Sequence, residues 1–173
     1  MRVLLREATP DDEPFLWSML TYAASMTPGG AESVEDAKRD ASLPWYAHRW
    51  GSRTGDMGVV ARRGGDEDET LLGAAWVRLL LEGEGDDAAK HKVATTEIPE
   101  LAIGVAPEHR GRGIGAALLG ELVRRARGRY PALALSVRET NPSVRLYERV
   151  GFVVERSVVN RVGGSSLVMR LPL

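Results

Sequence analysis

Residues 98–119 combine a strand pattern, a glycine-rich loop and a helix pattern in an unbroken order. Large apolar residues alternate with small or polar ones over residues 100–105, a two-residue period that predicts a β-strand. Pro107 ends this strand, and a run of arginine and glycine follows over residues 110–115. Ile114, Ala117, Leu118 and Leu122 then follow at spacings of three and four, which predicts a helix. This order of elements is typical of a phosphate-binding site.

The loop has the composition that an anion site requires. The first N–H groups of a helix have no partner within it, and the aligned peptide dipoles leave partial positive charge there. Gly111, Gly113 and Gly115 allow close approach of the backbone to a ligand and positive φ where it is needed. Arg110 and Arg112 precede the helix, which is a poor place for cations unless an anion lies between them. We therefore predict that this loop binds a pyrophosphate.

Two cofactor classes could use such a loop. Gly111-x-Gly113-x-x-Ala116 satisfies the loose dinucleotide pattern of a Rossmann unit. In that unit, however, the first glycine lies at the end of the first strand, whereas here residues 106–110 intervene and about 100 residues precede the loop. A Rossmann-type oxidoreductase therefore remains the weaker alternative.

The second class rests on two motifs. Arg110, Gly113 and Gly115 match the pattern Arg-x-x-Gly-x-Gly, and a second motif follows about 30 residues later at residues 141–152, NPSVRLYERVGF. Together they closely resemble the GNAT superfamily of acetyl-CoA-dependent N-acetyltransferases, clearly over roughly residues 70–155 and only in general layout over the first 60 residues. The resemblance implies acetyl-CoA as co-substrate. The residues that it implies for the cofactor site are Ile103, Val105, Arg110, Gly111, Arg112, Gly113, Ile114, Gly115, Asn141 and Ser143.

Acyl transfer to an amine requires a group that deprotonates the amine. The small residues Ala102 and Gly104 would leave room for a slender cofactor arm, and Glu100 lies on the same face of the predicted strand. We therefore predict Glu100 as the general base. The resemblance agrees, because in GNAT enzymes a carboxylate on this strand often deprotonates the amine, directly or through a water. Glu97, which lies beyond Pro99, and an ordered water are the alternatives.

Tyr147 is the candidate acid. The resemblance implies that the tyrosine of the second motif protonates the departing CoA thiolate, and Tyr147 occupies that position. A phenol with a pKa near 10 can donate a hydrogen bond to a thiolate whose conjugate acid has a pKa of about 8.5. The alternative role is a buried tyrosine that packs its helix on the sheet. The three histidines show no partner pattern for catalysis, and no residue spacing indicates a metal site.

The composition excludes several other classes. A chain of 173 residues fits a single domain, here an N-acetyltransferase domain over residues 1–173. A net charge of −1 does not indicate general affinity for nucleic acid or membranes. The absence of cysteine excludes a cysteine acyl intermediate, so acyl transfer must be direct or use another nucleophile, and direct transfer in a ternary complex is our first hypothesis. Because no apolar run approaches the length of a membrane span, a cytoplasmic protein is the default expectation.

The remaining patterns predict an α/β (α+β) fold in which about seven strands form a mixed, mostly antiparallel sheet flanked by roughly four helices. The strand over 132–137 should be parallel to that over 100–105, because a helix separates them. Residues 82–96 lack periodicity and predict a loop. Further strands are expected near 3–5, 56–62, 70–81, 152–161 and 165–171, and further helices over 10–25, 33–41 and 141–150. Thr9 is the expected cap of the first of these helices, Gly151 the expected end of the last, and residues 64–66 an expected turn.

Four questions stay open from the sequence alone. Six of the ten aromatic residues lie in the first 50 positions, where they could line an acceptor pocket or fill a core: Phe15, Trp17, Tyr22, Trp45, Tyr46 and Trp50. The sequence does not specify the amine acceptor, which could be a small molecule or a peptide. It does not specify the oligomeric state either, and a homodimer is possible. A non-catalytic sensor that binds CoA or a nucleotide would share the same cofactor loop.

Overall fold

The computed structural model describes residues 1–25, 30–65, 69–84, 93–159 and 163–173. These residues form seven strands in the order β1-β2-β3-β4-β5-β7-β6 and five α-helices. The pairs β1-β2, β2-β3, β5-β7 and β6-β7 are antiparallel, and β4-β5 is parallel. The predicted α/β fold with a mixed, mostly antiparallel sheet is therefore confirmed. No helix of the described residues is long and apolar enough to cross a membrane.

The chain divides into two compact units, and β4 (Glu100–Val105) and α5 (Ile114–Ala126) contribute residues to both. The first unit comprises Met1–Val77 and Ala102–Leu122. The second comprises Arg78–Leu101 and Val123–Leu173.

The first unit contains the N-terminal strands and three helices that pack together. Strand β3 ends at Arg78, three residues before the predicted end. A short helix that the sequence did not predict begins at Pro44, and it brings the helices of the described residues to five. The elements are β1 (Val3–Glu7), α1 (Glu13–Ser25), α2 (Val34–Arg39), α3 (Pro44–Ala47), β2 (Met57–Arg63) and β3 (Leu71–Arg78).

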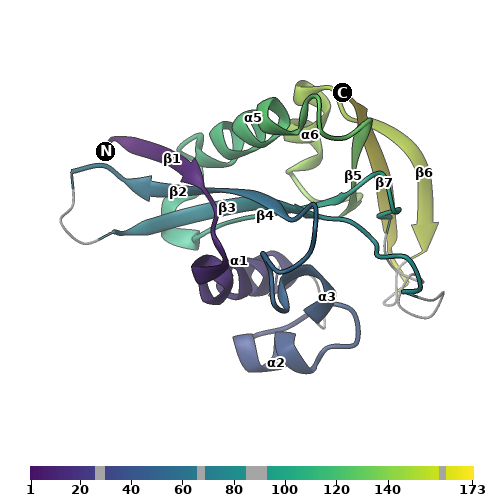
Figure 1. The fold of residues 1–173 in the computed structure, drawn as a ribbon, viewed down its shortest axis with the longest axis horizontal. Helices are drawn as coiled ribbons and strands as arrows, with labels where there is room; N and C mark the ends of the chain where they lie inside the picture. The colour runs from purple at the N-terminus through teal and green to yellow at the C-terminus, as the bar shows by residue number, and fades with distance from the viewer. Residues whose placement is uncertain (26–29, 66–68, 85–92, 160–162) are drawn as a thin grey trace. The chain divides into compact units, whose positions relative to one another are not determined.

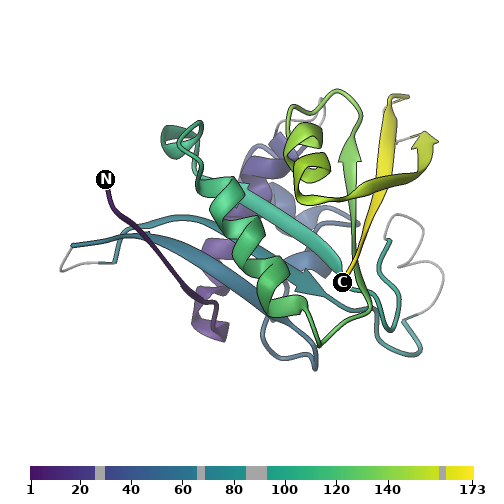
Figure 2. The ribbon, with the colours of Figure 1, turned by 90° about the horizontal axis from the view of Figure 1, so that it is seen from above.

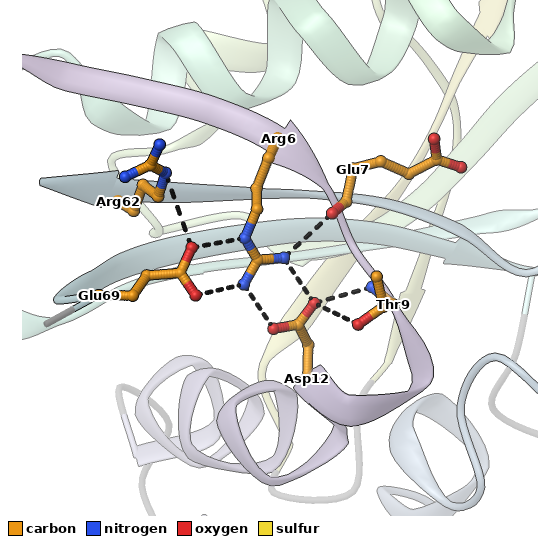
Figure 3. A network of polar contacts seen from close by, with 6 residues as sticks. All are labelled: Arg6, Glu7, Thr9, Asp12, Arg62 and Glu69. Carbon is orange, nitrogen blue, oxygen red and sulfur yellow. Dashed lines mark hydrogen bonds and ion pairs between the residues drawn. The ribbon is translucent and has the colours of Figure 1, made fainter. Parts of the chain in front are cut away.

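The start of α1 is organised by a polar network (Figure 3). Thr9 N–H donates to Asp12 Oδ2 over 2.7 Å, and the Arg6 guanidinium donates to both oxygens of Asp12 over 2.8 Å each. Arg6 also donates to both carboxylate oxygens of Glu69, over 2.7 and 3.0 Å. These contacts tie β1, the turn before α1 and the segment before β3 to one another. Thr9 is the N-cap of a 3₁₀ turn, Pro10–Asp12, that leads into α1, and the bond from its N–H to the Asp12 carboxylate holds this turn.

The same network depends on pH in a defined direction. Burial raises the pKa of Asp12, but hydrogen bonds from Arg6 and Thr9 outweigh it and hold that pKa below its usual range. The stability that Asp12 contributes is therefore present above the ordinary carboxyl pKa near 4 and is lost as the pH falls through the lowered pKa of the folded state.

The N-terminal aromatic residues fill a core. Trp17 and Trp50 are 4% and 3% exposed and belong to the same buried cluster as Trp76, whose Nε1 donates to Tyr46 O over 2.9 Å. The half-buried side chains of Phe15, Tyr22 and Tyr46 pack against this cluster, and Trp45 is 8% exposed. Of the two roles considered from the sequence, core packing is confirmed for this group.

Two strand glycines bring helices close to the sheet of the first unit. A Cβ on Gly104 in β4 would lie 2.6 Å from Met19 O in α1, and a Cβ on Gly73 in β3 would lie 3.1 Å from Leu118 Cδ1 in α5. Figure 1 shows α1 and α5 on opposite faces of this part of the sheet. The expectation that Gly104 leaves room for a cofactor arm is therefore wrong, because α1 fills that space.

In the second unit, β5 (Ala132–Arg138) pairs in parallel with β4 at Glu100 and Ala134, as predicted. Strand β7 (Ser165–Pro172) lies between β5 and β6 (Val153–Val159), so β6 ends the strand order. Figure 2 shows these C-terminal strands side by side near the yellow end of the chain.

The helix of the second motif, α6 (Val144–Val150), starts three residues later than predicted. The delay has a local cause, because the Asn141 side-chain oxygen accepts from Ser143 N–H over 2.8 Å and forms a turn before the helix. Gly151 ends α6 with φ of 115°, which confirms the predicted glycine cap.

Parts of three predictions lie outside the described residues. The predicted 82–96 loop is described only at 82–84 and 93–96, and the predicted turn at 64–66 only at Gly64 and Gly65. The last two residues of the predicted 152–161 strand are likewise not described.

Candidate active site

The segment between β4 and the loop glycines is a short turn that belongs to the first unit. Ala106 N–H donates to Leu72 O over 3.0 Å at the end of β4, and residues Pro107–His109 form a single 3₁₀ turn. The Arg110 side chain folds back, and its Nε donates to Val105 O over 3.1 Å. The five residues that separate strand and loop therefore form a compact connection.

The loop glycines have the geometry of a ligand-facing backbone. Gly111 and Gly113 have φ of 73° and 79°, and in the described part of the chain no atom lies within 4 Å of a Cβ built on either. Both glycines and Arg112 are exposed. Positive φ costs an L-residue roughly 1–2 kcal/mol, so the backbone conformation favours glycine, and the open space leaves room for a ligand.

The start of α5 follows the loop directly. Ala117 N–H donates to Gly113 O over 3.0 Å and closes the first helical turn. The N–H groups of Ile114, Gly115 and Ala116 therefore have no partner within the helix. The Ile114 side chain is 2% exposed and anchors the first turn in the core. Unpartnered backbone donors and the helix dipole therefore meet at the start of α5, beside the exposed Arg112, and this arrangement suits an anion.

The two strand residues expected at the cofactor, Ile103 and Val105, are half-buried in β4 and alternate with Gly104 along the strand. The Val105 carbonyl already accepts from Arg110. The Ile103 side chain lies on the opposite face of the strand from the one that α1 covers.

The candidate base lies in the second unit. Glu100 is the first residue of β4 and only 2% exposed, and its Oε1 accepts from Val93 N–H over 3.4 Å. Glu97, the alternative, is exposed on a turn in which its N–H donates to Thr95 Oγ1 over 3.2 Å. Glu100 is therefore the carboxylate that the fold holds away from bulk water.

Tyr147 also lies in the second unit. Its side chain is 7% exposed, and its ring meets the Phe152 ring edge-on with centroids 6.0 Å apart. Burial raises the pKa of Tyr147 to about 12. The phenol is therefore protonated at neutral pH and can donate a hydrogen bond.

Asn141 and Ser143 form the turn before α6. The Asn141 side-chain oxygen accepts from Ser143 N–H, and Asn141 N–H donates to Arg138 O over 2.9 Å. The side-chain amide nitrogen of Asn141 is thus the donor that this residue can offer to a ligand.

One buried charge was missed by sequence analysis. Arg78, the last residue of β3, is only 1% exposed. Buried arginines are rare, which makes this side chain a candidate for a functional role. The signal in the sequence was a single charge that interrupts the otherwise uncharged run over residues 71–81.

The sheet decides between the two cofactor classes. A Rossmann unit requires parallel strands, whereas β1, β2 and β3 are antiparallel neighbours. The Rossmann alternative is therefore wrong.

Comparison with known proteins identifies the class. Residues 17–152 match the model of the acetyltransferase (GNAT) family. Mycothiol acetyltransferase from Thermobispora bispora is 34% identical over 155 residues, which make up 87% of this chain and 46% of that protein. The chain therefore spans about half the length of this relative. The chain belongs to the GNAT acetyltransferase family, as its two motifs indicated.

Solved structures share the fold over nearly the whole chain. A ribosomal-protein-alanine N-acetyltransferase from Brucella melitensis has a TM-score of 0.67 at 25% identity and covers 98% of this chain and 99% of its own. The yncA protein from Salmonella typhimurium was solved with its cofactor acetyl-CoA. It has a TM-score of 0.70 at 23% identity, and the match covers 99% of this chain and 94% of the yncA chain.

Proposed function

We propose that the chain is a single N-acetyltransferase domain that transfers the acetyl group of acetyl-CoA to a primary amine of a small molecule or peptide. The observation that carries this proposal is the open, positive-φ backbone of Gly111 and Gly113 at the start of α5, in a chain of the GNAT family. When bound, acetyl-CoA supplies a thioester whose carbonyl carbon accepts the amine.

The loop holds the cofactor in this proposal. The N–H groups at the start of α5 donate to the pyrophosphate, and Arg112 adds a full charge beside them. Arg110 keeps the turn before the loop in place through its bond to Val105 O. The Asn141 amide nitrogen and Ser143 are proposed as further cofactor contacts.

Two buried side chains carry the proton transfers. Glu100 takes the proton of the amine, directly or through a water, and Val93 N–H orients its carboxylate. Tyr147 donates its proton or a hydrogen bond to the sulfur as the carbon–sulfur bond breaks. The chain has no cysteine, so a cysteine acyl-enzyme cannot form, and in this proposal the amine attacks the thioester directly in a ternary complex.

The acceptor is the least specified part of the proposal. The names of two similar acetyltransferases mention different kinds of molecule, mycothiol in one and a ribosomal-protein alanine in the other. Both a small-molecule amine and a protein N-terminus are therefore acceptors to test.

The test is a panel of amines incubated with acetyl-CoA, with free thiol release as the readout. An N-acetyltransferase releases CoA only with particular amines, and Glu100→Gln should lower that rate at neutral pH without changing acetyl-CoA affinity. The conservative change keeps the shape of the side chain but removes the base.

A thermal-shift measurement separates the alternatives. Acetyl-CoA and CoA should raise the Tm and NAD should not, because a ligand that binds the native state stabilises it. A Tm shift without turnover on any amine would favour the non-catalytic CoA sensor. Stabilisation by NAD alone would contradict the proposal.

A further inference from the structure

Strand β6 has an unusual surface. It ends the strand order, with β7 as its sheet neighbour. All seven of its residues are exposed, including Val153 (59%), Val154 (47%), Val158 (38%) and Val159 (80%). Six large apolar side chains are exposed in the part of the chain that the structure describes, and four of them lie on this one strand. Edge strands of this kind are sites of association unless they are covered or blunted.

The register with β7 assigns these side chains to two faces. Val153, Arg156 and Val158 lie opposite Arg170, Val168 and Ser166 and share their face. Glu155 is the extra residue at an irregularity between Val154 and Arg156, and its carboxylate lies 3.3 Å from Arg170 Nη2.

This ion pair places Glu155 on the same face as Arg156, and their charged atoms approach to 3.9 Å. One face of β6 therefore presents a valine, an acid, a base and a valine in sequence order.

That row is complementary to itself. If two copies of β6 lie antiparallel about a twofold axis between Glu155 and Arg156, each Glu155 faces the Arg156 of the other copy. The same register places each Val153 opposite the Val158 of the other copy. Opposite charges and apolar side chains directly across from each other on neighbouring strands stabilise the pairing.

We propose that β6 is a self-association surface through which a second copy of this chain pairs antiparallel, with Glu155 and Arg156 forming two symmetric cross-copy ion pairs. A two-fold contact of this kind uses one patch twice, so a single strand supplies both halves of the interface. The pairing also places Val153 and Val158 of each copy against an apolar partner and supplies a neighbour for the edge of β6 that faces away from β7 among the described residues.

The competing explanation is that the charges and the irregularity at Glu155 protect the edge of a monomer, a device that natural sheets use. The two explanations differ in what charge reversal does. Protection predicts a monomer whichever sign the charges have, whereas self-association depends on their complementarity.

The experiment measures the mass of the full chain by light scattering and sedimentation. Wild type should dimerise. Glu155→Arg and Arg156→Glu should each weaken the dimer by at least about tenfold, because each places two like-charge pairs in the interface. The double variant E155R/R156E should recover the dimer, and an equimolar mixture of the two single variants should form a heterodimer.

Two controls separate this result from a general effect of charge or folding. Arg127→Glu changes the net charge as Arg156→Glu does, at an exposed residue just after α5, and should leave the dimer intact. Circular dichroism and Tm should confirm that all variants are folded. A monomeric wild type, single variants that dimerise normally, or a double variant that does not recover would each overturn the proposal.

Discussion

Two pairs of glycines lie within one unit and serve opposite purposes. Gly73 and Gly104 lie in strands, and a Cβ on either would meet backbone atoms within 2.8 Å. Gly111 and Gly113 lie in the loop, with positive φ, and in the described residues nothing approaches a Cβ on either within 4 Å. The first pair is required because neighbours are close, and the second because the backbone turns in open space.

The two pairs of glycines therefore distinguish positions that matter for stability from positions that matter for ligand binding. A side chain added at a strand glycine must displace helix or strand, so it acts on the free energy of unfolding. A side chain added at a loop glycine meets no protein atom, so its main effect falls on whatever ligand occupies the space. Glycine alone does not distinguish these cases, whereas φ and the surrounding atoms do.

The largest effect is expected at Gly104. Gly104→Ala should lower the free energy of unfolding by about 3 kcal/mol, at the upper end of overpacking effects, because the new Cβ would lie 2.6 Å from Met19 O in the backbone of α1. Urea unfolding followed by circular dichroism measures this change. A variant as stable as wild type would mean that α1 does not press on this strand.

The second effect concerns Gly113. Gly113→Asp should weaken CoA binding by about 100-fold, because it places a side chain and a negative charge where the pyrophosphate approaches. Its cost in stability should be about 1–2 kcal/mol from the positive φ alone. Isothermal titration with CoA measures the affinity, and chemical unfolding measures the stability.

Gly128→Asp is the matched control. Gly128 also has φ of 79° and no described atom within 4 Å of a Cβ, but it follows the far end of α5. It should lose similar stability and keep CoA affinity. If both variants lose the same CoA affinity, the pyrophosphate does not bind specifically at the Gly113 loop.

These glycines show which features of the fold and the site the sequence alone could predict. Local signals were sufficient for the strand over 100–105, the loop and the cap at Gly151, because alternation, glycine and helix spacing act over a few residues. The two motifs indicated the family correctly. The role of Gly104 was missed because α1, some 80 residues earlier in the chain, occupies the space beside it.

Other misses have the same origin. The burial of Arg78 and the exposure of β6 depend on strand order, which nearby residues do not encode. The later start of α6 is a local exception, since Asn141 uses its side chain for a turn instead of a direct helix cap. The assigned roles of Glu100, Tyr147 and the cofactor-site residues remain predictions.

The third effect concerns Tyr147, where a substitution should change the reaction rate and not the CoA affinity that the glycine loop controls. Tyr147→Phe should lower kcat by about tenfold while CoA affinity is unchanged, because only the proton donor is lost. Stopped-flow rates under conditions where chemistry limits turnover provide the measurement. A wild-type kcat would reduce Tyr147 to a packing residue.

Tyr147 also predicts a pH dependence. The pKa is raised from an ordinary value near 10 to about 12 in the folded chain. The corresponding stability is present below pH 10 and is lost as the pH rises toward 12, because the unfolded state releases the proton first. Tyr147→Phe should remove this part of the alkaline loss of stability, as unfolding at several alkaline pH values would reveal.

The smallest effect is expected at Gly120, which belongs to neither pair. Gly120 is exposed within α5, and among the described residues no atom beyond its own helix backbone lies within 4 Å of a Cβ on it. Alanine favours a helix over glycine by roughly 1 kcal/mol, since glycine loses more backbone freedom on folding. Gly120→Ala should therefore raise the free energy of unfolding by about 0.5–1 kcal/mol and leave CoA affinity unchanged. Because the same substitution at Gly104 is expected to destabilise, opposite signs at the two positions would establish that surrounding atoms decide the outcome. Destabilisation at Gly120 instead would mean that another surface packs against this face of α5.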